Sequence, residues 1–284
     1  MNYVDLHVHS DASDGTLPPE EVVSAAAAAG LKAIALTDHD TVAGVVRARA
    51  AAERLPLELV PGIELSCVWQ GTEIHILGLF IDETCPALQQ ALDRLVQIRT
   101  RRNLQMLARF QEDGFAITLE DLRSGNPDTV ITRAHFARIL TEKGYAPSMD
   151  AAFREYLQYG GRYCARKEMV TPEEAMELLR TADAWPCLAH PVQYHLDGPQ
   201  LEALIRHLKQ QGLRGLEVYH PSQTPGQSSQ LREMARSHGL LPSGGSDFHG
   251  SNKPDIRLGV GRGGLRVSQA LLEDIRKDHA AKSR

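Results

Sequence analysis

Short apolar segments that run directly into histidine and acidic residues recur along the chain. Residues 31–36 lead into Asp38 and His39, and residues 185–189 lead into His190. Helical patterns separate these strand-like segments. Repeated strand–helix units with polar side chains at the carboxyl ends of the strands are typical of (β/α) barrels whose active site lies on that face. About seven such units predict an α/β fold with a closed but distorted barrel.

The first of these segments, residues 3–9, carries the densest polar pattern. Side chains alternate between the two faces of a strand, so Asp5, His7 and His9 are expected to point the same way. Two imidazoles at i and i+2 form a two-point clamp for a metal ion. We expect the carboxylate of Asp5 to orient one of the two rings.

The alternation of strands and helices stops in the middle of the chain. Residues 86–165 show helical apolar spacing and turn residues, which predicts a helical insertion that caps one side of the barrel. The predicted organisation is a barrel first part (1–85), a helical cap subdomain (86–165) and a barrel second part (166–284). The arginines between 94 and 109 are interpreted as a solvated face, although such a face could also guide RNA.

Charge and hydropathy exclude several classes of protein. A net charge of −5 over 284 residues argues against a general polyanion binder, so any nucleic-acid substrate must be held by local charge. No apolar run approaches the ~20 residues that span a bilayer, and no signal-like segment follows Met1. We expect a cytoplasmic protein that binds neither membranes nor long duplex DNA, and no protein partner is implied.

Histidines and carboxylates at the predicted strand ends form one candidate metal centre. Its nine members are His7, His9, Asp14, His39, Glu64, His75, His190, Asp247 and His249. Nitrogen and oxygen ligands without thiolates suit Mn, Fe, Zn or Mg, and at three or four ligands per ion the set can hold two or three divalent ions. Surplus positive charge favours a phosphate ester as substrate, and closely spaced metals lower the pKa of a bridging water. The predicted reaction is therefore hydrolysis.

The same residues carry a resemblance to a known family. The motifs are Asp5-x-His7-x-His9, Ser13-Asp14-Gly15-Thr16, Thr37-Asp38-His39-Asp40, Gly62-Ile63-Glu64, His75, Ala189-His190-Pro191 and Gly245-Ser246-Asp247-Phe248-His249. Together they resemble the PHP (polymerase and histidinol phosphatase) family. The resemblance implies a distorted seven-stranded β/α barrel with a trinuclear site, with Mn placed first among the metals, and a catalytic metal-bridged hydroxide held by Glu64, Asp247 and His190.

The resemblance also implies how the ligands divide among three ions. One ion would be held by His7, His9, Glu64 and Asp247, a second by Glu64, His75 and His190, and a third by Asp14, His39 and His249. Glu64 would bridge the first two.

Within the family, the loop at Asp14 and the helical insertion resemble the nucleoside 3′,5′-bisphosphate phosphatases. The implied substrates are molecules such as 3′-phosphoadenosine 5′-phosphate or short 5′-phosphorylated oligonucleotides, degraded from the 5′ end. A second phosphate needs a cationic pocket away from the metals. The predicted substrate-binding residues are Arg133, His135, Arg162, Lys167 and His220. A histidinol-phosphatase-like monoesterase and a non-catalytic metal-binding accessory module are the alternatives.

Overall fold

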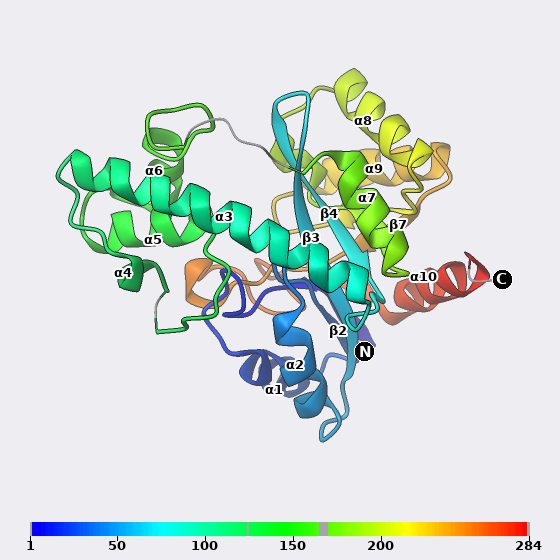
Figure 1. The fold of residues 1–284 in the computed structure, drawn as a ribbon. Coiled ribbons are helices and arrows are strands. Elements are labelled where there is room, and N and C mark those ends of the chain that lie inside the picture. Colours follow the sequence, from blue (N-terminus) through cyan, green and yellow to red (C-terminus); the bar gives the residue numbers. More distant parts are fainter. Residues whose placement is uncertain (1, 124, 165–169, 283–284) are drawn as a thin grey trace.

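The protein is described by a computed structural model that covers residues 2–123, 125–164 and 170–282. Its centre is a sheet with the strand order β7-β6-β5-β4-β3-β2-β1-β8 (Figure 1). The strands are β1 (Tyr3–Val8), β2 (Ala33–Leu36), β3 (Glu58–Trp69), β4 (Thr72–Leu79), β5 (Trp185–Leu188), β6 (Gly215–Tyr219), β7 (Leu241–Gly244) and β8 (Val267–Ser268). The predicted α/β barrel is confirmed. The number of strands is eight rather than seven, because the two-residue strand β8 adds antiparallel to β1.

The helices fall into two groups, one around the barrel and one in the cap. Around the barrel lie α1 (Pro19–Ala28), α2 (Ala43–Ala52), α7 (Pro172–Thr181), α8 (Gly198–Gln210), α9 (Pro225–Ser237) and α10 (Gln269–Lys282). The cap contains α4 (Leu119–Arg123), α5 (Arg133–Glu142) and α6 (Met149–Glu155), and α3 (Pro86–Glu112) runs from the barrel into it (Figure 1). Two short 3-10 helices, η1 (Pro191–Tyr194) and η2 (Gly250–Asn252), follow β5 and β7.

The strand β3 is longer than the sequence pattern indicated. The sequence predicts a strand over residues 57–60 that ends at Pro61 and Gly62, followed by a separate hairpin of residues 64–69 and 72–78. The hairpin is confirmed, but its first strand is the continuation of β3, which runs unbroken from Glu58 to Trp69 and pairs along its second half with β4. Pairing with β4 therefore overrides the local turn signal, and it places Glu64 in the middle of one long strand rather than at the junction of two short ones.

Backbone hydrogen bonds draw the two ends of the sheet together. The amide of Asp247 donates to the carbonyl of His7 at 2.9 Å, and the amide of His9 donates to the carbonyl of Phe248 at 3.0 Å. A side chain on Gly245 would collide with the backbone of His7, so only glycine permits this approach. This closure brings the segment 245–249 beside the first strand.

Helix α3 connects two hydrophobic cores. Leu88 and Leu92 pack in a cluster with barrel residues such as Ile76, whereas Met106 and Phe110 pack in the cluster that forms the inside of the cap. One continuous helix therefore fixes the position of the cap relative to the barrel.

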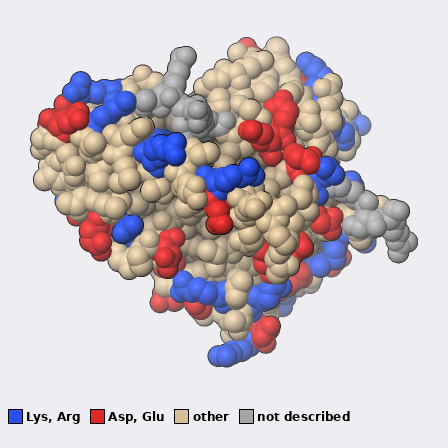
Figure 2. All heavy atoms as spheres, viewed as in Figure 1, with Lys and Arg blue, Asp and Glu red and all other residues tan. Residues whose placement is uncertain are grey.

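None of the helices in the described part of the chain is long and apolar enough to cross a membrane. Basic and acidic side chains are interspersed over the face seen in Figure 2, without a continuous basic surface on that face. This pattern agrees with the expectation that any anionic ligand is held by a local arrangement of charge.

Candidate metal centre

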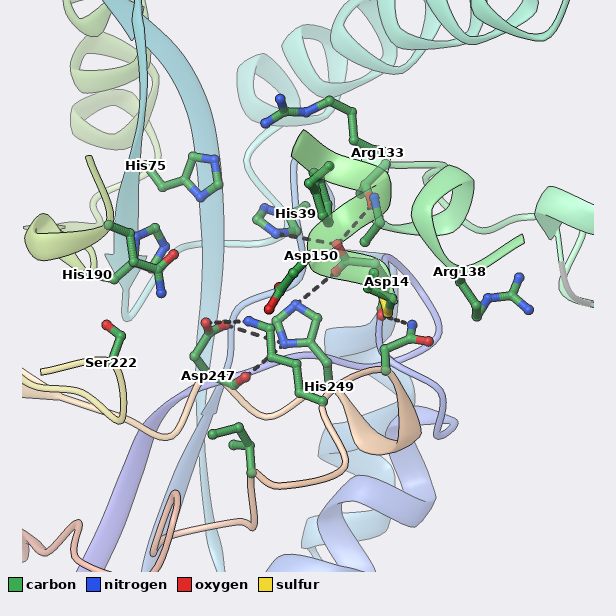
Figure 3. A pocket seen from close by; sticks show the side chains of 18 of the residues that line it. Asp14, His39, His75, Arg133, Arg138, Asp150, His190, Ser222, Asp247 and His249 are labelled. Carbon is green, nitrogen blue, oxygen red and sulfur yellow. Dashed lines mark hydrogen bonds and ion pairs between the residues drawn. The ribbon is translucent and has the colours of Figure 1, made fainter. Parts of the chain in front are cut away.

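The nine predicted ligands gather at one cavity of about 1010 Å³, and six of them are labelled in Figure 3: Asp14, His39, His75, His190, Asp247 and His249. Eight of them are buried, and His75 is partly exposed. Seven line the cavity itself, while His7, on β1, and His9, just after β1, are fully buried and do not line it. The structure therefore brings together residues that are up to 242 positions apart in the chain, from His7 to His249.

Four subsets of these residues have ligand atoms close enough to share an ion. In each subset the atoms lie within 4.8 Å of one another. The subsets are His9, Asp14, His39 and His249; His7, Glu64 and His190; His7, His9 and Asp247; and His39, Glu64 and His75. The overlap between them means that several ions could share ligands.

Glu64 lies between two of these groups. Its Oε1 is 3.0 Å from Nδ1 of His75 and 2.9 Å from Nε2 of His190. Its Oε2 is 3.2 Å from Nε2 of His9 and 3.3 Å from Nε2 of His7. A carboxylate whose two oxygens face different imidazoles has the geometry of a bridging ligand, and this arrangement supports the bridging role expected from the family resemblance.

Several buried polar atoms in this cluster have no hydrogen-bond partner among the described residues. They are Oε2 of Glu64 and Nδ1 of His9, His39 and His190. In addition, Nε2 of His7 and Nε2 of His9 face each other at 3.1 Å. Buried polar atoms are normally paired, and ring nitrogens at this spacing are the donors that Zn, Mn or Fe prefer. The residues therefore fit divalent metal ions.

The charge state of the carboxylates Glu64 and Asp14 also suits the binding of divalent metal ions. Burial would raise the pKa of Glu64, but its electrostatic interactions with the imidazoles of His39 and His7 outweigh burial and hold the pKa well below its usual value. The same balance of burial against His39 and His249 lowers the pKa of Asp14. Both side chains are therefore ionised, as a metal ligand must be.

Asp5 does not orient either histidine ring, and the prediction of that role is wrong. Its carboxylate accepts from the amide and the hydroxyl of Ser246, at 2.7 and 2.6 Å, and from the amide of Gly259 at 2.7 Å. Closure of the barrel presents these donors to Asp5. Asp5 thus stabilises the segment that leads to Asp247, and another residue must orient the rings.

Glu217 contacts the candidate metal centre and was not predicted from the sequence. It is fully buried on β6, and its Oε1 lies 3.0 Å from Nδ1 of His7. The available signal was an acidic residue between Leu216 and Val218 in an otherwise apolar strand. A buried carboxylate is rare unless it is paired, so its position alone indicated a partner in the barrel interior.

The predicted substrate-binding residues lie in different surroundings. Arg133 lines the cavity and pairs with Glu73, and its guanidinium stacks over Tyr159 at 4.0 Å. His220 also lines the cavity, where Nδ1 accepts from the amide of Ser222, so Nε2 carries the proton and faces Oδ2 of Asp247 at 3.3 Å.

Two other predicted residues are placed away from the cavity surface, and one cannot be placed. His135 is buried beneath it, where Nδ1 accepts from the amide of Thr132 as part of the α5 cap. Arg162 pairs with Asp113 on the cap surface, with 67% of its side chain exposed. The structure therefore does not bring His135 or Arg162 to the cavity, because helix capping and a surface ion pair occupy them. Lys167 lies outside the described residues.

Two arginines of α3 line the cavity where the predicted phosphate-binding residues were expected. Arg99 and Arg102 are buried and line the cavity, so the interpretation of the helix as a solvated face is wrong at these positions. Arg99 pairs with Asp40 and donates to the hydroxyl of Ser66 at 2.9 Å. The packing of α3 against the barrel turns one side of its basic residues inward.

Comparisons with known proteins identify the family of this chain. A family model described as "PHP domain" matches residues 5–210. The chain is 37% identical to the 5′-3′ exoribonuclease Rnm of Escherichia coli (strain K12) over 257 residues, which cover 90% of this chain and 87% of that protein. It is 36% identical to the 3′,5′-nucleoside bisphosphate phosphatase of Chromobacterium violaceum, with 88% of each chain covered.

Solved structures give the same result. An amidohydrolase from Chromobacterium violaceum superposes with a TM-score of 0.87 at 32% identity, covering 97% of this chain and 96% of that chain. A metal-dependent phosphoesterase described from Bifidobacterium adolescentis superposes with a TM-score of 0.84 at 30% identity, covering 96% and 95%. With the ligand cluster and the barrel in place, these matches show that the chain belongs to the PHP domain family and is a metal-dependent phosphoesterase.

Proposed function

We propose that this phosphoesterase removes the 3′-phosphate from nucleoside 3′,5′-bisphosphates and cleaves short 5′-phosphorylated oligonucleotides from the 5′ end. The two reactions break the same bond, between phosphorus and the 3′ oxygen of the first nucleoside. They differ only in whether another nucleotide is attached to that phosphate. The relatives named above, an exoribonuclease and a bisphosphate phosphatase, support both versions.

The observation that carries the proposal is the buried guanidinium of Arg102 in the same cavity as the ligand cluster. Its only side-chain hydrogen bonds among the described residues go to Oδ1 of Asn103, at 3.1 and 3.0 Å, and no described carboxylate pairs with it. By contrast, Arg99 and Arg133 are neutralised by Asp40 and Glu73. Burial and the charge of Arg99 lower the pKa of Arg102 from its ordinary value, and an arginine still remains charged.

A buried cation without an anionic partner is costly unless a ligand supplies the charge. A guanidinium matches a phosphate through paired N–H donors. Arg102 lies on α3, the helix that leads into the cap, so it would hold the 5′-phosphate while the 3′-phosphate meets the ligand cluster. A substrate with two phosphates fits this arrangement better than a monoester does.

Different residues of the chain would bind the metal ions, the 5′ end of the substrate and the reacting phosphate. Two or three divalent ions, with Mn as our first choice, would be held by the nine ligands and would supply Lewis-acid charge and an acidified water. Arg102 and Arg99 would fix the 5′ end of the substrate, and Arg133 would position the adjoining cap. Lys253, which lines the cavity beside Asp247, would face the reacting phosphate from the opposite side.

The test is phosphate release by Mn-loaded protein from adenosine 3′,5′-bisphosphate, 3′-AMP, 5′-AMP and histidinol phosphate. We expect a strong preference for the bisphosphate. The Arg102→Met variant should lose most of this preference while its activity on 3′-AMP changes little. Arg101→Met, which removes an exposed arginine from the same helix, is the matched control.

The other outcomes are informative as well. Equal or greater activity on histidinol phosphate would favour the monoesterase alternative and remove the substrate assignment. Full metal occupancy without turnover of any substrate would favour a non-catalytic module. Release of 5′-AMP from 5′-phosphorylated di- and trinucleotides would establish the exonuclease reaction.

A further inference from the structure

The buried carboxylate of Glu217 connects two strands that carry predicted metal ligands. Its Oε1 lies 3.0 Å from Nδ1 of His7 on β1, and its Oε2 accepts from the backbone amide of His190, just after β5, at 2.6 Å. Its side chain is 0% exposed. None of the four ligand subsets contains it, so its two oxygens act on the ligands rather than among them.

The first contact decides which nitrogen of His7 faces the centre. Because a carboxylate only accepts hydrogen bonds, Nδ1 of His7 must carry a proton. The other nitrogen, Nε2, lies 3.3 Å from Oε2 of Glu64 and 3.6 Å from Oδ1 of Asp247. The tautomer of a ligating histidine is set by the hydrogen bond that its other nitrogen makes. Glu217 therefore leaves the lone pair at Nε2 for a metal.

The second contact holds an uncommon backbone conformation. His190 has φ 21° and ψ 57°, which lies in the left-handed region that non-glycine residues rarely adopt. This conformation directs Nε2 of His190 to within 2.9 Å of Oε1 of Glu64. Such a conformation persists only when its surroundings fix it, and the bond from its amide to Glu217 is one of the contacts that do so.

We propose that Glu217 is a positioning residue of the metal centre, which selects the His7 tautomer and holds the His190 backbone so that divalent ions meet a preformed site. Both carboxylate oxygens of Glu217 are used as acceptors, Oε1 by His7 and Oε2 by the amide of His190.

The substitution Glu217→Gln tests this role sharply, because glutamine has the same shape but only one acceptor oxygen. If that oxygen accepts from His190, the amide NH₂ must face Nδ1 of His7. The ring can then accept only by moving its proton to Nε2, the nitrogen that faces the centre. If the oxygen instead accepts from His7, two donors meet at the amide of His190.

The experiment measures Zn²⁺ affinity by chelator competition and the His7 imidazole by ¹H–¹⁵N NMR in the Zn²⁺-loaded protein. For Glu217→Gln we expect a loss of 10- to 100-fold in affinity, the range typical of residues that orient a metal ligand. In the wild type, the Nδ1 proton of His7 should be shifted downfield and exchange slowly, and in the variant this signal should move or disappear.

Asp5→Asn is the matched control. Asp5 is also a fully buried carboxylate with several donors, but no histidine ring contacts it. The control should lower the free energy of unfolding yet keep the Nδ1 proton signal of His7, because Asp5 acts on the segment at Ser246 and not on the ring of His7.

An unchanged affinity together with an unchanged His7 signal in Glu217→Gln would overturn the proposal. If Glu217→Gln does not fold, the NMR spectrum of the wild type tests the proposal instead. A His7 ring without a hydrogen-bonded Nδ1 proton in that spectrum would also overturn the proposal. If the wild type binds no Zn²⁺, the metal centre itself is refuted. If the wild type and Glu217→Gln bind Zn²⁺ equally well, the metal centre stands and only the role of Glu217 is refuted.

Discussion

Asp247 presents its two carboxylate oxygens to different surroundings, and Lys253 contacts only one of them. Oδ2 accepts from Nζ of Lys253 at 2.5 Å. Oδ1 instead lies 3.5 Å from Nε2 of His9 and 3.4 Å from Nδ1 of His249. The lysine side chain is 38% exposed, so its ammonium group is available to an anion that enters the cavity.

The first prediction follows from this position. Lys253→Met should lower kcat/KM for adenosine 3′,5′-bisphosphate by about 10- to 100-fold, since a hydrogen bond to a charged group contributes roughly 1.5–3 kcal/mol. Metal content, measured by elemental analysis, should be retained because Oδ1 is untouched. Lys277→Met, on the exposed surface of α10, is the control. If metal were lost together with activity, Lys253 would act by orienting Asp247 rather than by contacting substrate.

A second prediction concerns the cap. Phe110 is fully buried, and its ring stacks on Tyr163 at 4.0 Å between centroids. Phe110→Ala should reduce the free energy of unfolding by about 3–5 kcal/mol, the usual cost of such a cavity, and should make the cap more sensitive to limited proteolysis. Leu104→Ala on the same helix, where the side chain is 47% exposed, should cost far less. Similar losses in both variants would contradict the assigned cap core.

A third prediction is that metal removal destabilises the whole protein. Treatment with a chelator should lower Tm, and adding Mn or Zn should raise Tm as the metal concentration rises. When the free metal concentration is 100 times Kd, the free energy of unfolding should be higher by about 2.7 kcal/mol. The reason is that Oε2 of Glu64 has no described hydrogen-bond partner and two imidazole nitrogens face each other. Glu64→Gln should lose most of the metal-dependent increase. If neither the chelator nor the added metal changed Tm, the assignment of a metal site would be contradicted.

A fourth prediction concerns pH and lies far from the metal centre. Asp278 on α10 accepts from Arg214 at 2.6 and 2.7 Å and from the indole of Trp185 at 2.7 Å. The hydrogen bonds from Arg214 are the main cause of a lowered pKa at Asp278. A carboxyl group with a lowered pKa binds fewer protons when folded. Its stabilisation is therefore present above the unfolded pKa of about 4 and is lost as the pH falls through the folded value.

Asp278→Asn should therefore be less stable than the wild type at pH 7, by roughly 1–2 kcal/mol. Chemical denaturation at several pH values should show this difference shrinking below about pH 4. Asp274→Asn, at an exposed position of the same helix, should show almost no pH-dependent difference. If the difference in the free energy of unfolding between the wild type and Asp278→Asn grew at acidic pH, the pKa of Asp278 would not be lowered by folding.

Much of the fold and the centre could be predicted because the evidence is local. A strand that ends in His39 or His190 carries its own pattern of apolar and polar residues, and parallel strands deliver such ends to one rim. The predicted set of metal ligands at that rim was found together. The continuation of β3 past Pro61 could not be read locally, because the partner strand β4 decides it.

The sequence by itself determined the barrel, the helical insertion and the candidate ligand residues, since spacing and residue type indicate each of them within a short stretch. Only the tertiary structure decided which polar side chains act on one another. Asp5 and Glu217 are both buried carboxylates, yet barrel closure gives Asp5 the amide of Ser246, while the placement of β6 beside β5 brings Glu217 to the amide of His190. Likewise, Arg101 and Arg102 are neighbours in the chain, and the helix rotation alone exposes one and buries the other in the cavity.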